Sequence, residues 1–326
     1  MRVFVSGVTG FTGGHLARAL LSRGYEVCGL VRDASKAHAL DMAGIVPVVG
    51  DLVDRQSLAR ALRGVEVAYN IAALYREAGL PTATYRAVNA EAVATLIEVA
   101  ASAGVKRVVH CSTVGVHGDI EQPPANEDAP LRPNDVYQET KLEGERLAHE
   151  ASTRTGIEVT IARPSGIYGP GDRRLLKLFR GVARGRWVTL GSGEIFYHLT
   201  HVRDLAEGFR LCGEVPSAAG RTYILAGGEV TTLNELVRIV ADEAGVRPPR
   251  RHLPVWPFWV AGAMCEAVCA PLRVEPPIYR RRVDFFIKSR AFDISRARAE
   301  LGYAPAIGLR EGIRDTLAWY RKEGWL

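Results

Sequence analysis

Short apolar runs alternate with longer amphipathic stretches through the first half of the chain. This alternation is typical of βαβ units that build a parallel sheet. The apolar runs predict strands at residues 2–6, 25–31, 46–49, 65–71, 107–111 and 158–162. Helices are expected between them at residues 15–22, 34–43, 55–63, 84–103 and 136–153. Six strands with intervening helices predict an α/β fold of the Rossmann type, built on a doubly wound parallel sheet.

The pattern changes after Arg163, where glycine and proline interrupt the regular alternation. Helices are expected beyond it at residues 173–184, 202–213, 231–244, 254–270 and 308–323. We therefore predict a dinucleotide-binding Rossmann domain over residues 1–165. A smaller mixed α/β region over 166–326 is expected mainly to bind substrate, with returns to the first domain near 195–215 and 287–296.

A glycine-rich turn follows the first predicted strand directly and opens the first predicted helix. Its sequence is Gly7-Val8-Thr9-Gly10-Phe11-Thr12-Gly13, which has GxxGxxG spacing. Glycines let a backbone approach a pyrophosphate closely, and the helix N-terminus stabilises its negative charge. The residues expected to hold a dinucleotide here are Gly7, Thr9, Gly10, Phe11, Thr12 and Gly13.

The end of the second predicted strand bears on the choice between NAD and NADP. An NAD enzyme normally has a carboxylate there to hold the adenosine ribose, whereas this chain has Val31 and Arg32. A guanidinium pairs bidentately with a 2′-phosphate, so Arg32 favours NADP. The alternative is that Arg32 caps a surface turn and Asp33 takes the ribose role, in which case the cofactor is NAD.

Two more strand ends offer contacts for a cofactor. Asp51 and Leu52 follow the third predicted strand, where a short carboxylate can accept a hydrogen bond from the adenine amino group. Alternatively, Asp51 caps the helix that follows. Ala72 and Ala73 follow the fourth predicted strand, and their small side chains allow a flat cofactor to lie against the backbone.

Tyr137 and Lys141 are four residues apart on one predicted helix and therefore share a face. An ammonium beside a phenol favours the phenolate, which lowers the phenol pKa toward the working pH of an acid/base catalyst. The preceding strand ends in Cys111-Ser112-Thr113, so hydroxyl groups reach the same edge of the sheet. A hydroxyl in that place can hold a substrate oxygen while Tyr137 transfers its proton.

In this order, the glycine loop, the hydroxyl and the Tyr-Lys pair resemble the extended short-chain dehydrogenase/reductases of the NAD-dependent epimerase/dehydratase superfamily. Supporting segments are Val88-Asn89, Arg163-Pro164, Tyr168-Gly169-Pro170-Gly171 and His201-Val202-Arg203-Asp204-Leu205-Ala206. The resemblance covers essentially the whole chain. It implies that Thr113, Tyr137 and Lys141 are catalytic and that the latter two also contact the cofactor. It further implies cofactor contacts for Asn89 and Pro164, and His117 replaces the family's usual tyrosine.

Substrates of this family divide chiefly into nucleotide sugars and bulky apolar alcohols or ketones. Sugar-nucleotide enzymes typically have an asparagine where this chain has Gly166 and an arginine where it has Tyr197. The aromatic segments 253–264 and 282–289 resemble the 3β-hydroxysteroid dehydrogenase and dihydroflavonol reductase branch. The aromatics of these two segments could line an apolar cleft or touch a membrane surface. The alternative is a core helix of the second region packed on the sheet.

The resemblance implies hydride transfer between a nicotinamide cofactor and a secondary alcohol or ketone of a steroid- or flavonoid-like substrate. The alternative is a UDP- or dTDP-sugar 4-epimerase. A dehydratase would need an acidic residue after the catalytic hydroxyl, and Val114 follows Thr113. A catalytically idle nucleotide sensor is disfavoured because all three catalytic residues are retained.

Charge and cysteine content narrow the range of partners. Lys and Arg number 42 against 36 Asp and Glu, a net charge of +6, with the basic residues scattered rather than gathered into a nucleic-acid stripe. Arg280, Arg281 and Arg282 with Lys288 and Arg290 are typical of a solvated face. Five cysteines without a CxxC pair predict no disulfide framework and no metal site.

The start MRVFVSGVTG has no apolar signal core, and the most apolar stretch is too short to span a bilayer, so we expect a cytoplasmic protein. Peripheral contact with a membrane stays open. The family resemblance also implies a homodimer, formed through the helix before the fifth strand and the helix that carries Tyr137.

Overall fold

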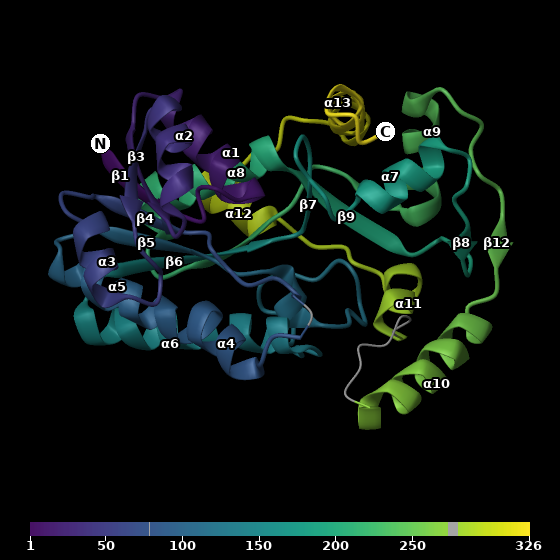
Figure 1. The fold of residues 1–326 in the computed structure, drawn as a ribbon, viewed down its shortest axis with the longest axis horizontal. Helices are drawn as coiled ribbons and strands as arrows, with labels where there is room; N and C mark the ends of the chain where they lie inside the picture. The colour runs from purple at the N-terminus through teal and green to yellow at the C-terminus, as the bar shows by residue number, and fades with distance from the viewer. Residues whose placement is uncertain (78, 273–279) are drawn as a thin grey trace.

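The computed structural model describes residues 1–77, 79–272 and 280–326. Seven parallel strands form its central sheet in the order β10-β6-β5-β4-β1-β2-β3 (Figure 1). They are β1 Arg2–Ser6, β2 Glu26–Val31, β3 Ile45–Val49, β4 Val67–Asn70, β5 Arg107–Cys111, β6 Glu158–Pro164 and β10 Thr222–Leu225. The order reverses between β1 and β4, as in a doubly wound Rossmann sheet, so the predicted fold class is confirmed.

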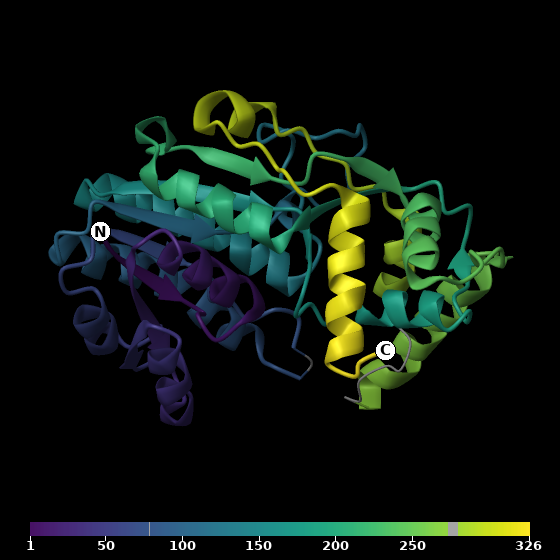
Figure 2. The same cartoon turned by 90° about the horizontal axis from the view of Figure 1, so that it is seen from above.

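Helices cover both faces of the sheet because its strands are apolar on both sides. On β1, Val3 and Val5 point into one core cluster with α1 (Phe11–Leu21) and α8 (Val202–Glu214), whereas Phe4 points into the other. The second cluster lies under α3 (Arg55–Ala61), α5 (Ala92–Ser102) and α6 (Val136–Thr155). Figure 2 shows α1 and α8 together on one side of the sheet. Catalytic and binding residues can therefore reach solvent only at the strand ends.

The sheet has one strand more than the sequence predicted. β10 pairs in parallel with β6, with Ile224 opposite Arg163, and lies outside both predicted returns of the chain. Its four residues are too short a run to be recognised without the neighbouring strand.

The predicted helix over 84–103 is three segments. They are α4 (Thr82–Arg86), a π-helical turn (Ala87–Glu91) and α5. Predicted helix 34–43 likewise divides into a 3₁₀ turn at Ala34–Lys36 and α2 (Ala37–Met42), and α1 begins at Phe11 inside the glycine loop. Two further 3₁₀ turns lie at Val114–His117 and Pro216–Ala218.

The rest of the chain forms a second core beside the carboxyl edge of the sheet. Its strands are β7 (Gly166–Tyr168), β9 (Phe196–His201) and β11 (Val230–Thr232) in one sheet, and β8 (Thr189–Leu190) with β12 (His252–Leu253) in another. Its helices are α7 (Leu176–Ala183), α9 (Leu233–Ala244) and α13 (Leu309–Lys322), with α11 (Arg280–Ile287) beside them. Helix α10 (Trp256–Leu272) packs against α11 outside this core, and α12 (Ser295–Leu301) returns to the central sheet beside β10. Within the described ranges, no helix is long and apolar enough to cross a membrane.

Candidate active site

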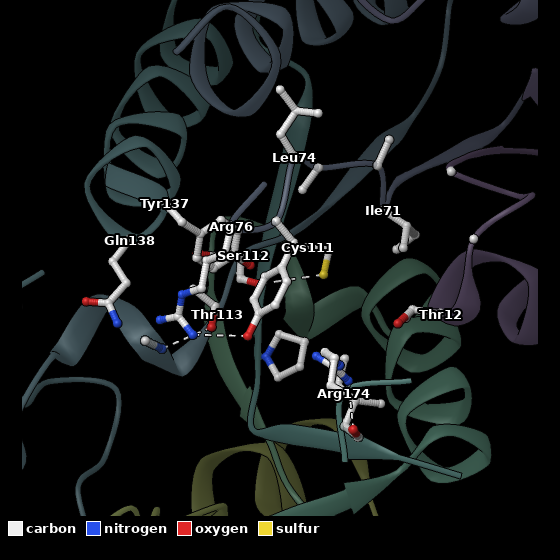
Figure 3. Close-up of a pocket in the computed structure, with 18 of the residues that line it drawn as sticks. Thr12, Ile71, Leu74, Arg76, Cys111, Ser112, Thr113, Tyr137, Gln138 and Arg174 are labelled. Carbon is white, nitrogen blue, oxygen red and sulfur yellow. Dashed lines mark hydrogen bonds between the residues drawn. The ribbon is translucent and has the colours of Figure 1, made fainter. Parts of the chain in front are cut away.

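A cavity of about 1080 Å³ lies at the carboxyl ends of the strands, between the sheet and the second core (Figure 3). The structure brings most of the predicted site residues to its wall. These are Gly7, Thr9, Gly10, Phe11, Thr12, Gly13, Arg32, Asp51, Leu52, Ala72, Ala73, Thr113, Tyr137 and Pro164. Asn89 and Lys141 are buried and are not part of that wall.

The glycine loop has no room for side chains at two of its glycines. Gly7 has φ +69°, and a Cβ there would lie 3.0 Å from the backbone of Ala72. A Cβ on Gly13 would lie 2.3 Å from the carbonyl oxygen of Gly7. Gly10 begins α1 without a side-chain cap, so the first N–H groups of the helix are left for a ligand. This bare cradle fits the pyrophosphate of a dinucleotide.

At the adenosine end of the cavity, Arg32 lines the wall and Asp33 does not. The Asp33 carboxylate accepts hydrogen bonds from the backbone N–H of Ser35 at 3.0 Å and from its hydroxyl at 2.6 Å. Asp33 therefore caps a turn, whereas no ion pair to Arg32 occurs among the described residues. An unpaired guanidinium at this position fits an anionic group on the ribose.

Asp51 does not cap α3. Its carboxylate accepts from the backbone N–H of Val53 at 3.2 Å, and the helix is capped by Asp54, which accepts from Gln56 and Ser57. Asp51 keeps its place on the cavity wall, which leaves the predicted contact with adenine open to it.

The predicted catalytic end of the cavity contains Thr113, which follows β5, and Tyr137, in the first turn of α6 (Figure 3). The Thr113 hydroxyl oxygen accepts from the N–H of Gly115 at 3.0 Å, so its own hydrogen is free to be donated. The Ser112 hydroxyl instead donates to the carboxylate of Glu145. The structure thus distinguishes the two neighbouring hydroxyls by their hydrogen bonds, which the sequence does not show.

A buried ion pair supports this end of the cavity from below. Arg163 donates to both carboxylate oxygens of Glu145, at 2.9 and 2.6 Å, and both side chains are about 5% exposed. The ring of His117 lies 3.2 Å from the same guanidinium, and burial followed by the Arg163 charge lowers the pKa of His117. A neutral His117 thereby replaces the family's tyrosine as part of this support.

Asn89 and Lys141 lie behind the wall. The Asn89 amide accepts from the N–H of Leu74 at 2.9 Å and donates to its carbonyl at 3.0 Å, so it holds the loop after β4. Burial lowers the pKa of the Lys141 amine, and the described part of the chain provides it with no hydrogen bond or ion pair. Lys141 is therefore a buried amine without a hydrogen-bond partner in the described chain, one layer behind the cavity wall.

Two arginines act on the Tyr137 phenol, in addition to the lysine that the sequence predicts there. Burial raises the pKa of Tyr137, as do neighbouring Cys111 and Tyr75, whereas Arg76 and Arg174 lower it. Lys141 lies about one helical turn further along α6.

Tyr75, Arg76 and Arg174 were missed by sequence reasoning. The Tyr75 ring packs edge-on against Tyr137 at 4.9 Å, and the Arg76 guanidinium lies 5.6 Å from the Tyr137 ring (Figure 3). Arg76 also pairs with Asp135 at 2.8 Å and donates to the Tyr75 hydroxyl at 3.0 Å. Arg76 has an unusual backbone angle, a φ of +46°. This angle cannot be read from the sequence, so no local pattern pointed to the residue.

Arg174 lies across the cavity between two rings. Its guanidinium is 5.7 Å from the Tyr75 ring and 6.0 Å from the Phe11 ring of the glycine loop. A hydrogen bond to the carbonyl of Ile167 at 2.7 Å holds it there. The residue therefore joins the catalytic end of the cavity to the end that fits the pyrophosphate.

The aromatic run of α10 does not line the cavity. Trp256 and Trp259 are exposed, and the aromatic rings on the wall belong to other segments, including Tyr197, Phe285 and Phe292. For segment 253–264, a cleft wall and a core helix are therefore wrong, whereas Phe285 of segment 282–289 does line the cavity. Lys288 and Arg290 line the cavity instead of a solvated face, and the side chains of Arg280, Arg281 and Arg282 lie outside the described residues.

Residues 3–226 match the model of the NAD dependent epimerase/dehydratase family. The chain belongs to this family. The chain is therefore an NAD(P)-dependent enzyme of the extended short-chain dehydrogenase/reductase type, since dehydrogenases are also among its relatives.

Two curated relatives of this epimerase/dehydratase chain are named for sterol chemistry. It is 31% identical to "Sterol demethylase protein B" of Methylococcus capsulatus, with all of both chains covered. It is 30% identical to "3beta-hydroxysteroid-dehydrogenase/decarboxylase isoform 2" of Arabidopsis thaliana over 96% of its own length. The alignment spans 61% of that longer plant protein.

Two solved structures share the whole fold of this chain. The crystal structure of gox2253 superimposes with a TM-score of 0.85 at 30% identity, covering 99% of each chain. MoeE5 in complex with UDP-glucose and NAD superimposes with a TM-score of 0.76 at 27% identity, again over 99% of each chain.

Proposed function

We propose that this enzyme is an NADP-preferring oxidoreductase for a secondary alcohol or ketone on a bulky apolar substrate of steroid or flavonoid type. The substrate class rests on the two positions at which sugar-nucleotide enzymes hold the nucleotide. In this chain they are Gly166 and Tyr197, and neither is free to bind a nucleotide. A side chain at Gly166 would meet Leu199, whose Cδ2 would be 2.7 Å from the new Cβ. The Tyr197 hydroxyl donates to the carbonyl of Phe285 at 2.5 Å and is therefore used within the protein.

The wall beyond Tyr137 is suited to an apolar polycycle. It is lined by apolar side chains from several elements, namely Leu74, Leu80, Val88, Ile167, Leu175, Leu199, Phe285 and Phe292. Removing apolar surface from water contributes about 25 cal/mol per Å². A steroid-sized ligand that buries about 300 Å² thus gains about 7 kcal/mol before the entropy of binding is subtracted.

The residues at the catalytic end divide the work on the substrate oxygen. Thr113 donates its free hydrogen to that oxygen and orients it. Tyr137 donates its proton to the oxygen of a ketone, or accepts the proton of an alcohol as a phenolate. A bound nicotinamide supplies or accepts the hydride, and Lys141 would hold its ribose.

The preference for NADP rests on Arg32. Its guanidinium lines the cavity without a carboxylate partner in the described chain, while Asp33 is engaged in its own turn. A 2′-phosphate would pair with that guanidinium, and a bare ribose would leave it unused.

A nucleotide-sugar 4-epimerase is the second candidate, and a specific observation favours it. Lys288 and Arg290 both line the cavity, and two cations suit a diphosphate. The Lys288 amine, however, already lies 2.7 Å from the carboxylate of Asp119. Structural relatives of this chain have been solved with UDP-sugars and NAD.

Calorimetry separates the two candidates. Protein loaded with NADP is titrated with UDP, UDP-glucose and a small sterol panel. We expect sterol binding and weak binding of both nucleotides. Tight binding of UDP without a sterol response would overturn the proposal and support the epimerase. Phe285→Ala should weaken only the apolar ligand, because its ring lies on the wall and its backbone carbonyl, which holds Tyr197, is retained.

The proposal extends to organisation and location. We propose a boundary near residue 165 between a cofactor-binding and a substrate-binding region, a homodimer formed through α5 and α6, and a place in the cytoplasm. Sedimentation equilibrium tests the dimer directly, and a monomer at all concentrations would remove it.

A further inference from the structure

Helix α10 is apolar on all sides but is not covered by the rest of the described chain. Between residues 256 and 269, Glu266 is the one charged residue, and Gly262 is the one buried residue. A helix that is apolar all round normally lies inside a protein. Helix α10 lies at the edge of the molecule with α11 on its inner side, so the described residues leave its outer face uncovered (Figures 1 and 2).

The exposed side chains form a continuous stripe along the helix. Trp256 is 69% exposed, Met264 is 60% exposed and Val268 is 63% exposed. Trp259 and Val260 lie between them, so the exposed positions follow one another at steps of three and four residues. Residues with this spacing share one helix face, and the stripe spans more than three turns.

Positive charge precedes the aromatic end of this stripe. Arg247, Arg250 and Arg251 are exposed in the segment between α9 and β12. None of the three forms an ion pair with another described residue. Aromatic residues beside arginines are typical of segments that rest in the interface of a lipid bilayer with anionic headgroups.

We propose that the α10 stripe docks on the surface of an anionic lipid bilayer, with the helix lying along the surface. The two indoles and the apolar stripe enter the interface, and the three arginines contact the headgroups. The helix is too short to cross the bilayer, which agrees with a peripheral arrangement. A second copy of the chain is the other possible occupant, but a bilayer explains why the aromatic end and the unpaired arginines are adjacent.

This surface adjoins the substrate end of the cavity. Helix α10 packs against α11, and α11 contributes Phe285 to the cavity wall. On the proposed function, an apolar substrate dissolved in the bilayer would enter the cavity beside α11 without crossing water. This last step rests on the proposed function, whereas docking itself does not.

Vesicle sedimentation of the full chain tests docking without cofactor or substrate. We expect the protein to sediment with phosphatidylcholine vesicles that contain phosphatidylglycerol, and at least about tenfold more weakly with phosphatidylcholine alone. Trp256→Ser combined with Trp259→Ser should weaken binding at least about tenfold. Arg250→Glu combined with Arg251→Glu should remove the preference for anionic vesicles.

Matched controls exist elsewhere on the surface. Met264→Ser should weaken vesicle binding, whereas Met42→Ser, at a 75% exposed methionine of α2, should not. Lys36→Glu combined with Arg63→Glu changes the charge as much as the arginine pair but should keep the anionic preference. Failure to sediment with either vesicle, or equal losses in variants and controls, would overturn the proposal.

A second copy would give a different result. If the α10 variants are monomeric in sedimentation equilibrium while the unmodified protein is dimeric, and the unmodified protein does not bind vesicles, the stripe is an interface between copies. The bilayer proposal is then wrong. Because neither readout uses turnover, failure of docking is distinguishable from failure of the oxidoreductase assignment.

Discussion

The position of Arg76 predicts that this arginine sets the pH range of the enzyme in one direction of reaction. Its guanidinium lies 5.6 Å from the Tyr137 ring and is among the charges that lower the pKa of that tyrosine. On the proposed mechanism, alcohol oxidation needs the phenolate of Tyr137, whereas ketone reduction needs its protonated form. Replacing Arg76 by methionine should therefore raise the Tyr137 pKa and harm oxidation selectively.

The magnitude follows from the separation of the charges. At an effective dielectric constant of about 20, two unit charges about 5.6 Å apart interact by about 3 kcal/mol, or about two pKa units. The Asp135 carboxylate lies 2.8 Å from the same guanidinium and offsets part of this interaction. We therefore expect the midpoint of the pH profile to move upward by about one unit, which is about a tenfold loss of oxidation below the midpoint.

The assay is kcat/KM against pH, measured for alcohol oxidation and for ketone reduction. Arg76→Met should displace the oxidation profile to higher pH and leave reduction at neutral pH nearly unchanged. Arg76→Lys should restore most of the profile because it keeps a cation. Arg55→Met, at an exposed arginine of α3, is the control. Equal losses in both directions at every pH would refute the reasoning, because they would indicate a structural role for Arg76.

Four further outcomes are expected. Arg32→Ala should weaken the binding of NADPH about tenfold and leave the binding of NADH unchanged, because one charge-assisted pair contributes about 1.5 kcal/mol at an exposed site. Equal affinities of the unmodified protein for NADPH and NADH would refute this. Tyr137→Phe should retain less than about a tenth of turnover with cofactor binding intact, whereas Lys141→Met should damage both, as turnover and fluorescence titration will measure. Gly13→Ala should abolish NADPH binding in the same titration, since its Cβ would lie 2.3 Å from the Gly7 carbonyl oxygen; unchanged affinity would exclude this cradle as the pyrophosphate site.

Local patterns in the sequence were sufficient for the parallel sheet and the glycine loop. The strands at 2–6 and 107–111 have the bounds that their apolar runs predict. Such features depend on near neighbours along the chain, since the side-chain period and the turn residues are local properties. The same locality placed Thr113 and Tyr137 at one edge of the sheet, because parallel strands and the helices that follow them share that edge.

Contacts between distant segments could not be read in this way. The strand β10 is defined by its pairing with β6, about sixty residues earlier in the chain. Tyr75 and Arg76 contact Tyr137, and Arg174 contacts Tyr75, from two loops whose conformations depend on what surrounds them. The two hydroxyls of Ser112 and Thr113 acquire different roles only because Glu145, on another element, accepts from the first.

The aromatic run that begins at Trp256 shows most clearly where sequence information ends. Its composition is the same whether the helix lines a cleft, fills a core or faces outward, so the sequence left all three open. The tertiary structure places α10 outside both core clusters of the sheet and outside the cavity wall, with Trp256 and Trp259 exposed. Burial is a property of what packs around a residue, and for this helix that is decided by the path of the whole chain.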